Sequence, residues 1–139
     1  MKYKFRAYHK KKERLVDVLE IDFENNVVTL TIETDGDDEY YWWSSTCHLD
    51  EVELMQYTGL TDVNGVEIYE GDIVQIGSMF QENVKKRIGQ VVFERGKYIF
   101  YENDFYKYEL DSMGMTIEVI GNIYQHRHLL KENEENGSN

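Results

Sequence analysis

Two histidines one residue apart, His126 and His128, form the best metal-binding pair in the sequence. If this segment is a strand, alternate side chains share one face, and both imidazoles could bind the same zinc or nickel ion. A third ligand is not evident nearby, and Glu132 or a partner chain would have to supply it. We therefore interpret the pair as an adventitious metal binder and predict neither a working metal site nor a cofactor.

The candidate nucleophile is the single cysteine, Cys47, which His48 follows directly. An imidazole can activate a thiol only where the two side chains meet. Because neighbours on a strand point to opposite faces, we interpret the pair as a buried thiol beside a surface histidine. A single cysteine also forms no internal disulfide, which fits a reducing compartment.

Acidic side chains recur at every second residue through Asp35, Asp37 and Glu39, and superficially resemble a calcium loop. The twelve-residue calcium loop requires glycine at its sixth position and glutamate at its twelfth. Counted from Asp35, those positions hold Tyr40 and Thr46. The motif fails, and the segment is interpreted as a solvated hairpin tip.

No other catalytic motif is evident in the sequence. The sequence lacks a nucleophile elbow, a phosphate-binding glycine loop, a dinucleotide fingerprint and a zinc-protease helix. We therefore predict that the protein is not an enzyme. A deep pocket lined by titratable groups would revive the enzymatic alternative.

A run of four aromatic residues follows the acidic segment. In isolation it resembles a stacking platform for bases or sugars, but platforms for nucleic acid are bordered by Lys and Arg, and none lie nearby in the sequence. We expect two of the four to lie in the core and the others to be covered by a partner chain or lobe, and we expect the run and the acids to border a protein contact surface. That predicted surface comprises Asp35, Asp37, Asp38, Glu39, Tyr40, Tyr41, Trp42 and Trp43.

The chain of 139 residues carries a net charge of −12 at pH 7, and no Lys or Arg occurs between Leu15 and Val84. Such a surface repels phosphate, so direct nucleic-acid binding is not expected. It would require residues 85–87 to lie beside residues 10–12 in space. We interpret the acidic half as solubilising; the alternative is an acidic patch that binds a basic host protein.

The N-terminal residues carry charges where a signal peptide needs an apolar core, and no run approaches the roughly 18 apolar residues of a membrane span. We therefore expect a cytoplasmic protein.

The elements that must position these residues are predicted to be strands. Apolar and polar residues alternate through short segments separated by turn residues, which is typical of antiparallel sheets. A mainly β fold with little helix is expected. Its predicted parts are an N-terminal antiparallel hairpin lobe (1–53), a small C-terminal β-barrel lobe packed with it (54–131) and a disordered tail (132–139).

The most specific stretch is residues 54–74, which reads as strand, tight turn, short strand, second turn and strand. In the first turn, Asn64 and Gly65 can both adopt positive φ. Gly71 marks a bend that requires a residue without Cβ, and Asp72 is predicted to cap it. Near the end of the chain, Gly121 is predicted to mark a bulge or a close backbone approach.

Three blocks together resemble the YopX family: residues 4–8 (KFRAY), residues 54–74, and residues 119–124 (VIGNIY) with the following Leu129 and Leu130. They cover the start, middle and end of the chain. The resemblance implies a β-protein of bacteriophages or prophages of low-GC Gram-positive bacteria, cytoplasmic, with an SH3-like C-terminal barrel and no assigned activity. Tyr8, where the family favours Trp, and the acidic first half depart from the family.

The leading functional hypothesis is a non-catalytic protein-binding or assembly module that forms homo-oligomers. Its basis is a small β-scaffold with surplus aromatic residues and no reaction chemistry. The alternative is an acidic decoy, or host-takeover factor, that binds a basic host protein.

Overall fold

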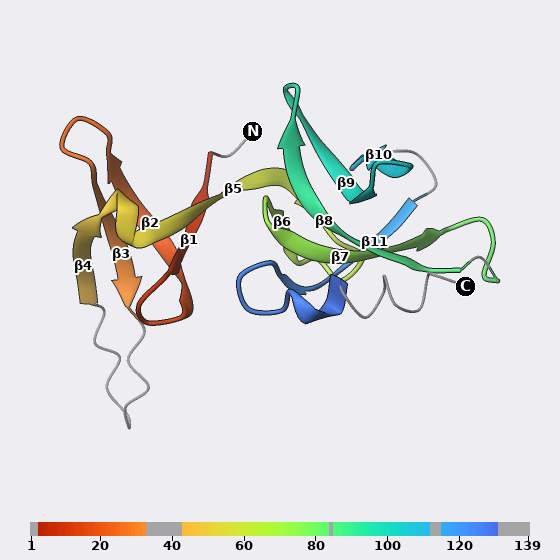
Figure 1. The fold of residues 1–139 in the computed structure, drawn as a ribbon, viewed down its shortest axis with the longest axis horizontal. Helices are drawn as coiled ribbons and strands as arrows, with labels where there is room; N and C mark the ends of the chain where they lie inside the picture. The colour runs from red at the N-terminus through yellow and green to blue at the C-terminus, as the bar shows by residue number, and fades with distance from the viewer. Residues whose placement is uncertain (1–2, 33–42, 84, 112–114, 131–139) are drawn as a thin grey trace. The chain divides into compact units, whose positions relative to one another are not determined.

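The structure, a computed structural model, describes residues 3–32, 43–83, 85–111 and 115–130. Antiparallel strands make up most of this described part (Figure 1), with one 3₁₀ turn and a helical turn that begins at His128. The predicted mainly β fold with little helix is therefore confirmed. None of the described helical segments is long and apolar enough to cross a membrane. The predicted tail, 132–139, lies outside the described residues.

The elements follow one another in the order β1 (Phe5–His9), β2 (Arg14–Asp22), β3 (Val27–Ile32), β4 (Trp43–His48), η1 (Leu49–Glu51), β5 (Val52–Thr61), β6 (Glu67–Tyr69), β7 (Asp72–Ser78), β8 (Arg87–Glu94), β9 (Lys97–Asn103), β10 (Tyr106–Glu109) and β11 (Met115–Asn122). The chain divides into two compact units, Tyr3–Gln56 and the part from Tyr57 onward. Strand β5 belongs to both, because residues 52–56 pair with β1 and residues 57–61 pair with β6.

In the N-terminal unit, the strands pair in the order β4, β3, β2, β1, β5. Alternating apolar residues of these strands meet on one face, as the period of two requires. The buried centre of this face contains Ala7, Val28, Leu30 and Val52. The 3₁₀ turn η1 leads into β5, and the Glu51 carboxylate accepts a hydrogen bond from the His48 backbone N–H at 2.7 Å.

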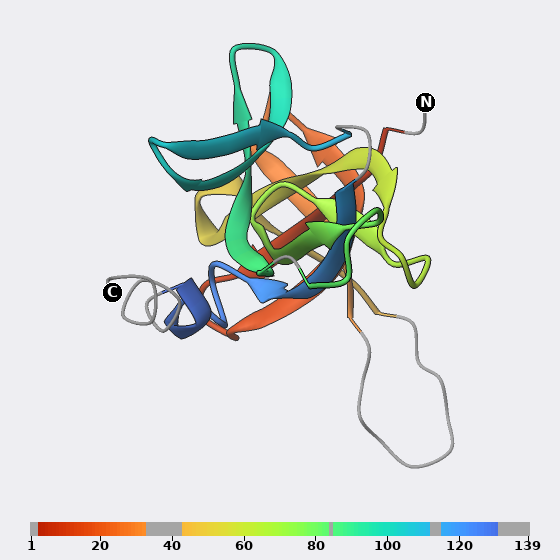
Figure 2. The same cartoon turned by 90° about the vertical axis from the view of Figure 1, so that its right-hand side faces the viewer.

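In the C-terminal unit, five strands pair in the order β10, β9, β8, β7, β11 (Figure 2). The inner face of this sheet supplies most of a core centred on Val74, Val91 and Phe100. The hairpin of β5 and β6 packs against the same core through Leu60 and Ile68. A sheet with one face covered in this way can bury apolar side chains without any helix.

The predicted small barrel is not closed. Among the described residues, β10 and β11 end the five-stranded sheet and do not pair with each other. The outer edge of β11 is instead occupied by the turn that follows β5: the Val63 backbone N–H donates to the Ile117 carbonyl at 3.0 Å. An edge strand bound by a turn has no need of barrel closure to satisfy its backbone.

The predicted turns are confirmed with one correction. Gly65 takes a left-handed φ of 81°, whereas Asn64 does not. The Asp72 carboxylate accepts a hydrogen bond from the Tyr69 backbone N–H at 2.8 Å and so caps the bend, as expected. The β7–β11 register shifts between Val119 and Gly121, which confirms the predicted bulge.

Candidate functional site

The contact surface predicted from the sequence is for the most part not described. Asp35, Asp37, Asp38, Glu39, Tyr40, Tyr41 and Trp42 lie outside the described residues. Trp43 begins β4, where its backbone pairs with Ile32. The prediction for this surface therefore stays a prediction.

The histidine pair does not lie on a strand, contrary to the expectation. Asn122 folds the chain back after β11, because its side-chain oxygen accepts from the backbone N–H of Tyr124 at 3.0 Å and of Gln125 at 2.9 Å. His126 follows this turn, and His128 begins the short helical turn. The ring centroids of the two histidines are 6.3 Å apart, and His126 Nδ1 accepts a hydrogen bond from the Asn122 backbone N–H at 3.1 Å. No cluster of three or more metal-ligating side chains occurs in the described part of the chain.

The cysteine is a packing residue of the N-terminal unit. Cys47 lies on β4 and packs, partly buried, against the core of that unit, while His48 is exposed. Burial raises the pKa of the Cys47 thiol, and the neighbouring Glu51 raises it further. A raised pKa lowers the thiolate fraction, which is the reactive form.

Asp62, in the turn after β5, is a buried acid whose two carboxylate oxygens both accept hydrogen bonds. One carboxylate oxygen accepts from the backbone N–H of Asn64 at 2.8 Å and of Val66 at 2.9 Å, and the other accepts from the N–H of Val119 on β11 at 2.9 Å. Burial raises the pKa of Asp62, but the N–H groups of Val119, Val66 and Asn64 lower it by more, so the net pKa lies below its ordinary value. Asp62 therefore joins a turn to a sheet edge and serves the fold.

At the β10 edge of the C-terminal sheet, aromatic side chains are exposed to solvent. Strand register places Phe100 opposite both Val91 on β8 and Tyr108 on β10, so these three side chains share the inner face. The ring of Tyr108 stacks against that of Phe100, with centroids 6.4 Å apart. Phe100 is fully buried, whereas Tyr108 is 41% exposed and continues the inner face into solvent.

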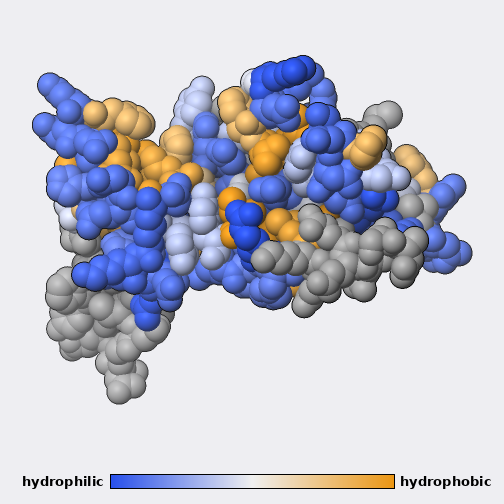
Figure 3. Space-filling model, viewed as in Figure 1, coloured by the Kyte–Doolittle hydropathy of each residue, from blue (hydrophilic) through white to orange (hydrophobic). Residues whose placement is uncertain are grey.

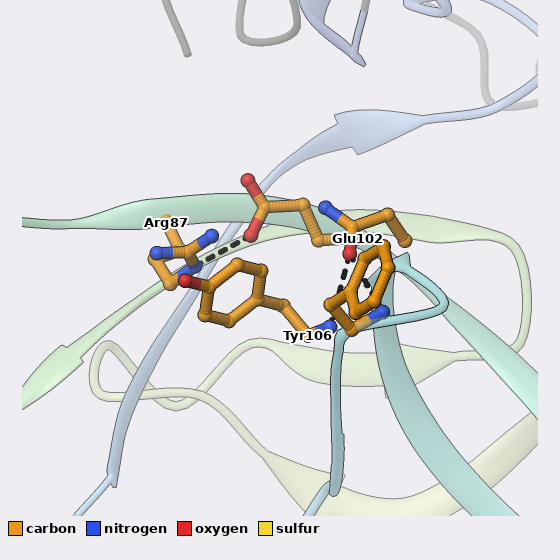
Figure 4. A network of polar contacts seen from close by, with 5 residues as sticks. Arg87, Glu102 and Tyr106 are labelled. Carbon is orange, nitrogen blue, oxygen red and sulfur yellow. Dashed lines mark hydrogen bonds and ion pairs between the residues drawn. The ribbon is translucent and has the colours of Figure 1, made fainter. Parts of the chain in front are cut away.

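An arginine at the start of β8 is held between two neighbours at this end of the sheet (Figure 4). The Arg87 Nε donates to a Glu102 carboxylate oxygen at 2.5 Å, and the guanidinium carbon lies 3.4 Å from the centroid of the Tyr106 ring. The side chains of Arg87 and Glu102 are 28% and 14% exposed. A guanidinium fixed by a carboxylate and an aromatic face has little rotamer freedom left to lose on binding.

The turn between β9 and β10 directs a phenylalanine into solvent. The Asn103 side-chain oxygen accepts from the backbone N–H of Phe105 at 2.8 Å and of Tyr106 at 3.0 Å, which fixes the turn. Phe105 is 92% exposed as a result. We use "aromatic surface" for Arg87, Phe105, Tyr106 and Tyr108. In Figure 3, apolar residues likewise lie exposed among hydrophilic ones over the C-terminal unit.

Sequence reasoning missed the aromatic surface because residues 104–110 are ambiguous when read alone. The signal was present in the alternation of Tyr106, Lys107, Tyr108 and Glu109, which is typical of a strand with one aromatic face. The stretch is only four residues long, and a polar turn precedes it. Its pairing with β9, which gives it structure, depends on the hairpin and not on local propensity.

Comparisons with known proteins cover nearly the whole chain. A family model described as "YopX protein" matches residues 4–131. The crystal structure of protein EF1440 from Enterococcus faecalis is 24% identical, with a TM-score of 0.62, and the alignment covers 94% of this chain and 99% of that one. The crystal structure of the yopX protein from Bacillus subtilis is 22% identical, with a TM-score of 0.59 and coverage of 91% and 96%. No curated protein matches the chain.

Proposed function

Because the chain belongs to the YopX family, we propose that it works as a non-catalytic protein-binding or assembly module whose partner docks on the aromatic surface. The observation that carries the proposal is the exposure of Phe105 on a turn fixed by two hydrogen bonds. A large apolar side chain in solvent has no role in the core, and aromatic side chains are typical anchors at the centres of protein interfaces.

The neighbours of Phe105 have the composition of an interface centre. Tyrosine and arginine are the residues most enriched among those that dominate binding energy. Tyr106 and Tyr108 are 40% and 41% exposed, and Arg87 already lies against Tyr106. Preorganisation of this kind supports binding because few rotamers must be fixed when a partner arrives.

The proposal that the module is non-catalytic is supported by what the polar residues do. Asp62 links a turn to β11, Asp72 caps the bend after β6, and Asn122 shapes the turn that contains His126. No buried side-chain nitrogen or oxygen in the described part lacks a hydrogen-bond partner. Asp62, Asp72 and Asn122 thus serve the fold, and the proposal assigns none of them a role as general acid or base.

We further propose that the protein is encoded by a phage or prophage and works in the host cytoplasm. The support is family membership, which carries the expectation drawn from the sequence blocks.

An SH3-like packing of the C-terminal unit is proposed on a separate basis. The hairpin of β5 and β6 covers one face of a short-stranded sheet, and an open relative of such a barrel would have this arrangement.

A substitution at the tip of the aromatic surface tests the proposed function. Phe105→Ser is expected to reduce recovery of the partner at least about tenfold in affinity capture from host lysate, because loss of an interface anchor costs about 2 kcal/mol. The matched control is Phe23→Ser, since Phe23 is also exposed (74%) but lies in the N-terminal unit. Mass spectrometry of the captured proteins provides the readout.

Equal recovery by the wild type and Phe105→Ser would contradict the proposal. The same capture, repeated at low and high salt, addresses the acidic-decoy alternative. A complex dominated by long-range charge attraction weakens steeply as salt rises, whereas an aromatic contact does not. Recovery that is lost at high salt and unaffected by Phe105→Ser would favour the decoy.

A further inference from the structure

The two edge strands of the five-stranded sheet differ in what contacts them. At the β11 edge, the Val119 backbone N–H donates to Asp62, and the Ile117 carbonyl accepts from Val63. The other edge is β10 (Tyr106–Glu109), whose four residues are all exposed. Strand β10 is therefore the edge at which another strand could extend this sheet.

The orientation of the β10 backbone follows from its pairing with β9. The Leu110 backbone N–H donates to the Tyr98 carbonyl at 3.1 Å, so Leu110 faces β9. Residues of an antiparallel strand alternate between facing one neighbour and facing the other. Tyr108 therefore also faces β9, and the backbone groups of Lys107 and Glu109 are directed away from it.

The charges of these two outward residues select one register for pairing of β10 with itself. A two-fold axis at Tyr108 sets Lys107 of each copy opposite Glu109 of the other. An axis at Lys107 would set two lysines opposite each other, and an axis at Glu109 would set two glutamates. Opposite charges across a strand pair stabilise it and like charges destabilise it, so only the first register is complementary.

We propose that β10 pairs with β10 of a second copy of this chain, antiparallel and centred on Tyr108. The inference rests on the proposed function and names the second copy as the partner. In this register, the two Tyr108 side chains form the central pair, which is the close, non-hydrogen-bonded type. Each ring already stacks on Phe100 of its own copy, so the pair extends the aromatic surface across the axis.

The ion pair of Glu109 with Lys97 is compatible with this pairing. The Glu109 Oε1 accepts a hydrogen bond from Lys97 Nζ at 2.5 Å, in an exposed ion pair. A carboxylate accepts several hydrogen bonds, so a lysine from a second copy can bind beside Lys97. Because the paired edge is only four residues long, association is expected to be weak and to depend on protein concentration.

Charge reversal tests the register directly. Sedimentation equilibrium from about 10 µM to about 1 mM is expected to show a monomer–dimer equilibrium for the wild type. Lys107→Glu and Glu109→Lys are each expected to weaken dimerisation at least about tenfold, because each sets like charges opposite each other twice. The two single variants mixed in equal amounts are expected to form a heterodimer, because every opposed pair is then of opposite sign. Lys11→Glu, an exposed charge reversal in the N-terminal unit, is the matched control.

A wild type that is monomeric throughout this range would overturn the inference. So would single variants that dimerise as the wild type does, or a mixture that gains nothing over its components, with circular dichroism confirming that each variant is folded. The proposed function is contradicted by a different result, namely equal partner recovery by the wild type and Phe105→Ser. Capture of a different protein by the wild type and not by Phe105→Ser would support the proposed function even if no dimer forms.

Discussion

Gly89→Ala is expected to lower the free energy of unfolding of the C-terminal unit by about 3 kcal/mol, since it overpacks a filled core. A Cβ at this position would lie 2.6 Å from the Tyr101 carbonyl oxygen and 2.8 Å from two ring carbons of Phe100. The carbonyl belongs to the backbone of β9, and the ring is fully buried, so neither can move aside locally. Hydrogen–deuterium exchange during urea unfolding measures the effect in β7–β9, with β1–β3 as an internal reference.

The matched control for this substitution is Gly77→Ala in the adjacent strand β7. There, a Cβ would meet the Thr116 hydroxyl oxygen at 2.9 Å and an aliphatic carbon of Lys86 at 3.8 Å. A hydroxyl on a rotatable side chain can turn away, so the expected cost is below about 1 kcal/mol. Equal destabilisation by the two substitutions would contradict the account of packing between β8 and β9.

Asp62→Asn is expected to destabilise the same unit by about 2 kcal/mol. The amide oxygen of the asparagine can still accept hydrogen bonds from the backbone N–H groups of Asn64 and Val66. The amide NH₂ would then face the N–H of Val119, and two donors form no hydrogen bond with each other. The turn would lose its connection to β11. Urea unfolding at pH 7 measures the loss, and an unchanged midpoint would show that Asp62 does not hold the turn.

The acid response of the wild type depends on the same carboxylate. Because the pKa of Asp62 is lower in the folded state, ionised Asp62 stabilises the fold above its unfolded pKa, near 4. This contribution disappears as the pH falls through the folded pKa. The free energy of unfolding should therefore decline more steeply below about pH 4 in the wild type than in Asp62→Asn.

The matched control for the acid response is Asp22→Asn in the N-terminal unit. Hydrogen bonds from the side chain and the backbone of Asn25 lower the pKa of Asp22, which is the last residue of β2 and lies in the other unit. Asp22→Asn is expected to leave the acid response of the C-terminal unit unchanged. A parallel decline in the wild type and Asp62→Asn would count against the role assigned to Asp62.

Much of the fold follows from local pattern and turn chemistry. The bend at Gly71, the cap by Asp72 and the bulge at Gly121 all depend on residue types that few other conformations explain. That the sheet is open was harder to predict from the sequence, because it depends on a contact between Asp62 and Val119, which are 57 residues apart. No periodicity within either segment encodes such a pairing.

The candidate site was predicted less well than the fold, for a related reason. The aromatic run of residues 40–43 stands out in the sequence, but Tyr40, Tyr41 and Trp42 lie outside the described residues. The aromatic surface is assembled from β8, the β9–β10 turn and β10, and Arg87 meets Tyr106 only through tertiary structure. The exposure of Phe105 depends on the Asn103 turn, which sequence alone indicates weakly.

The central claim is that the aromatic surface is where this protein meets another protein chain. The most direct measurement is photo-cross-linking in host cells, with p-benzoyl-phenylalanine in place of Phe105 or, as control, in place of Phe23. We predict a discrete cross-linked protein product from position 105 and none from position 23, with the second copy of this chain as the expected product. No product from position 105, or the same products from both positions, would contradict the claim.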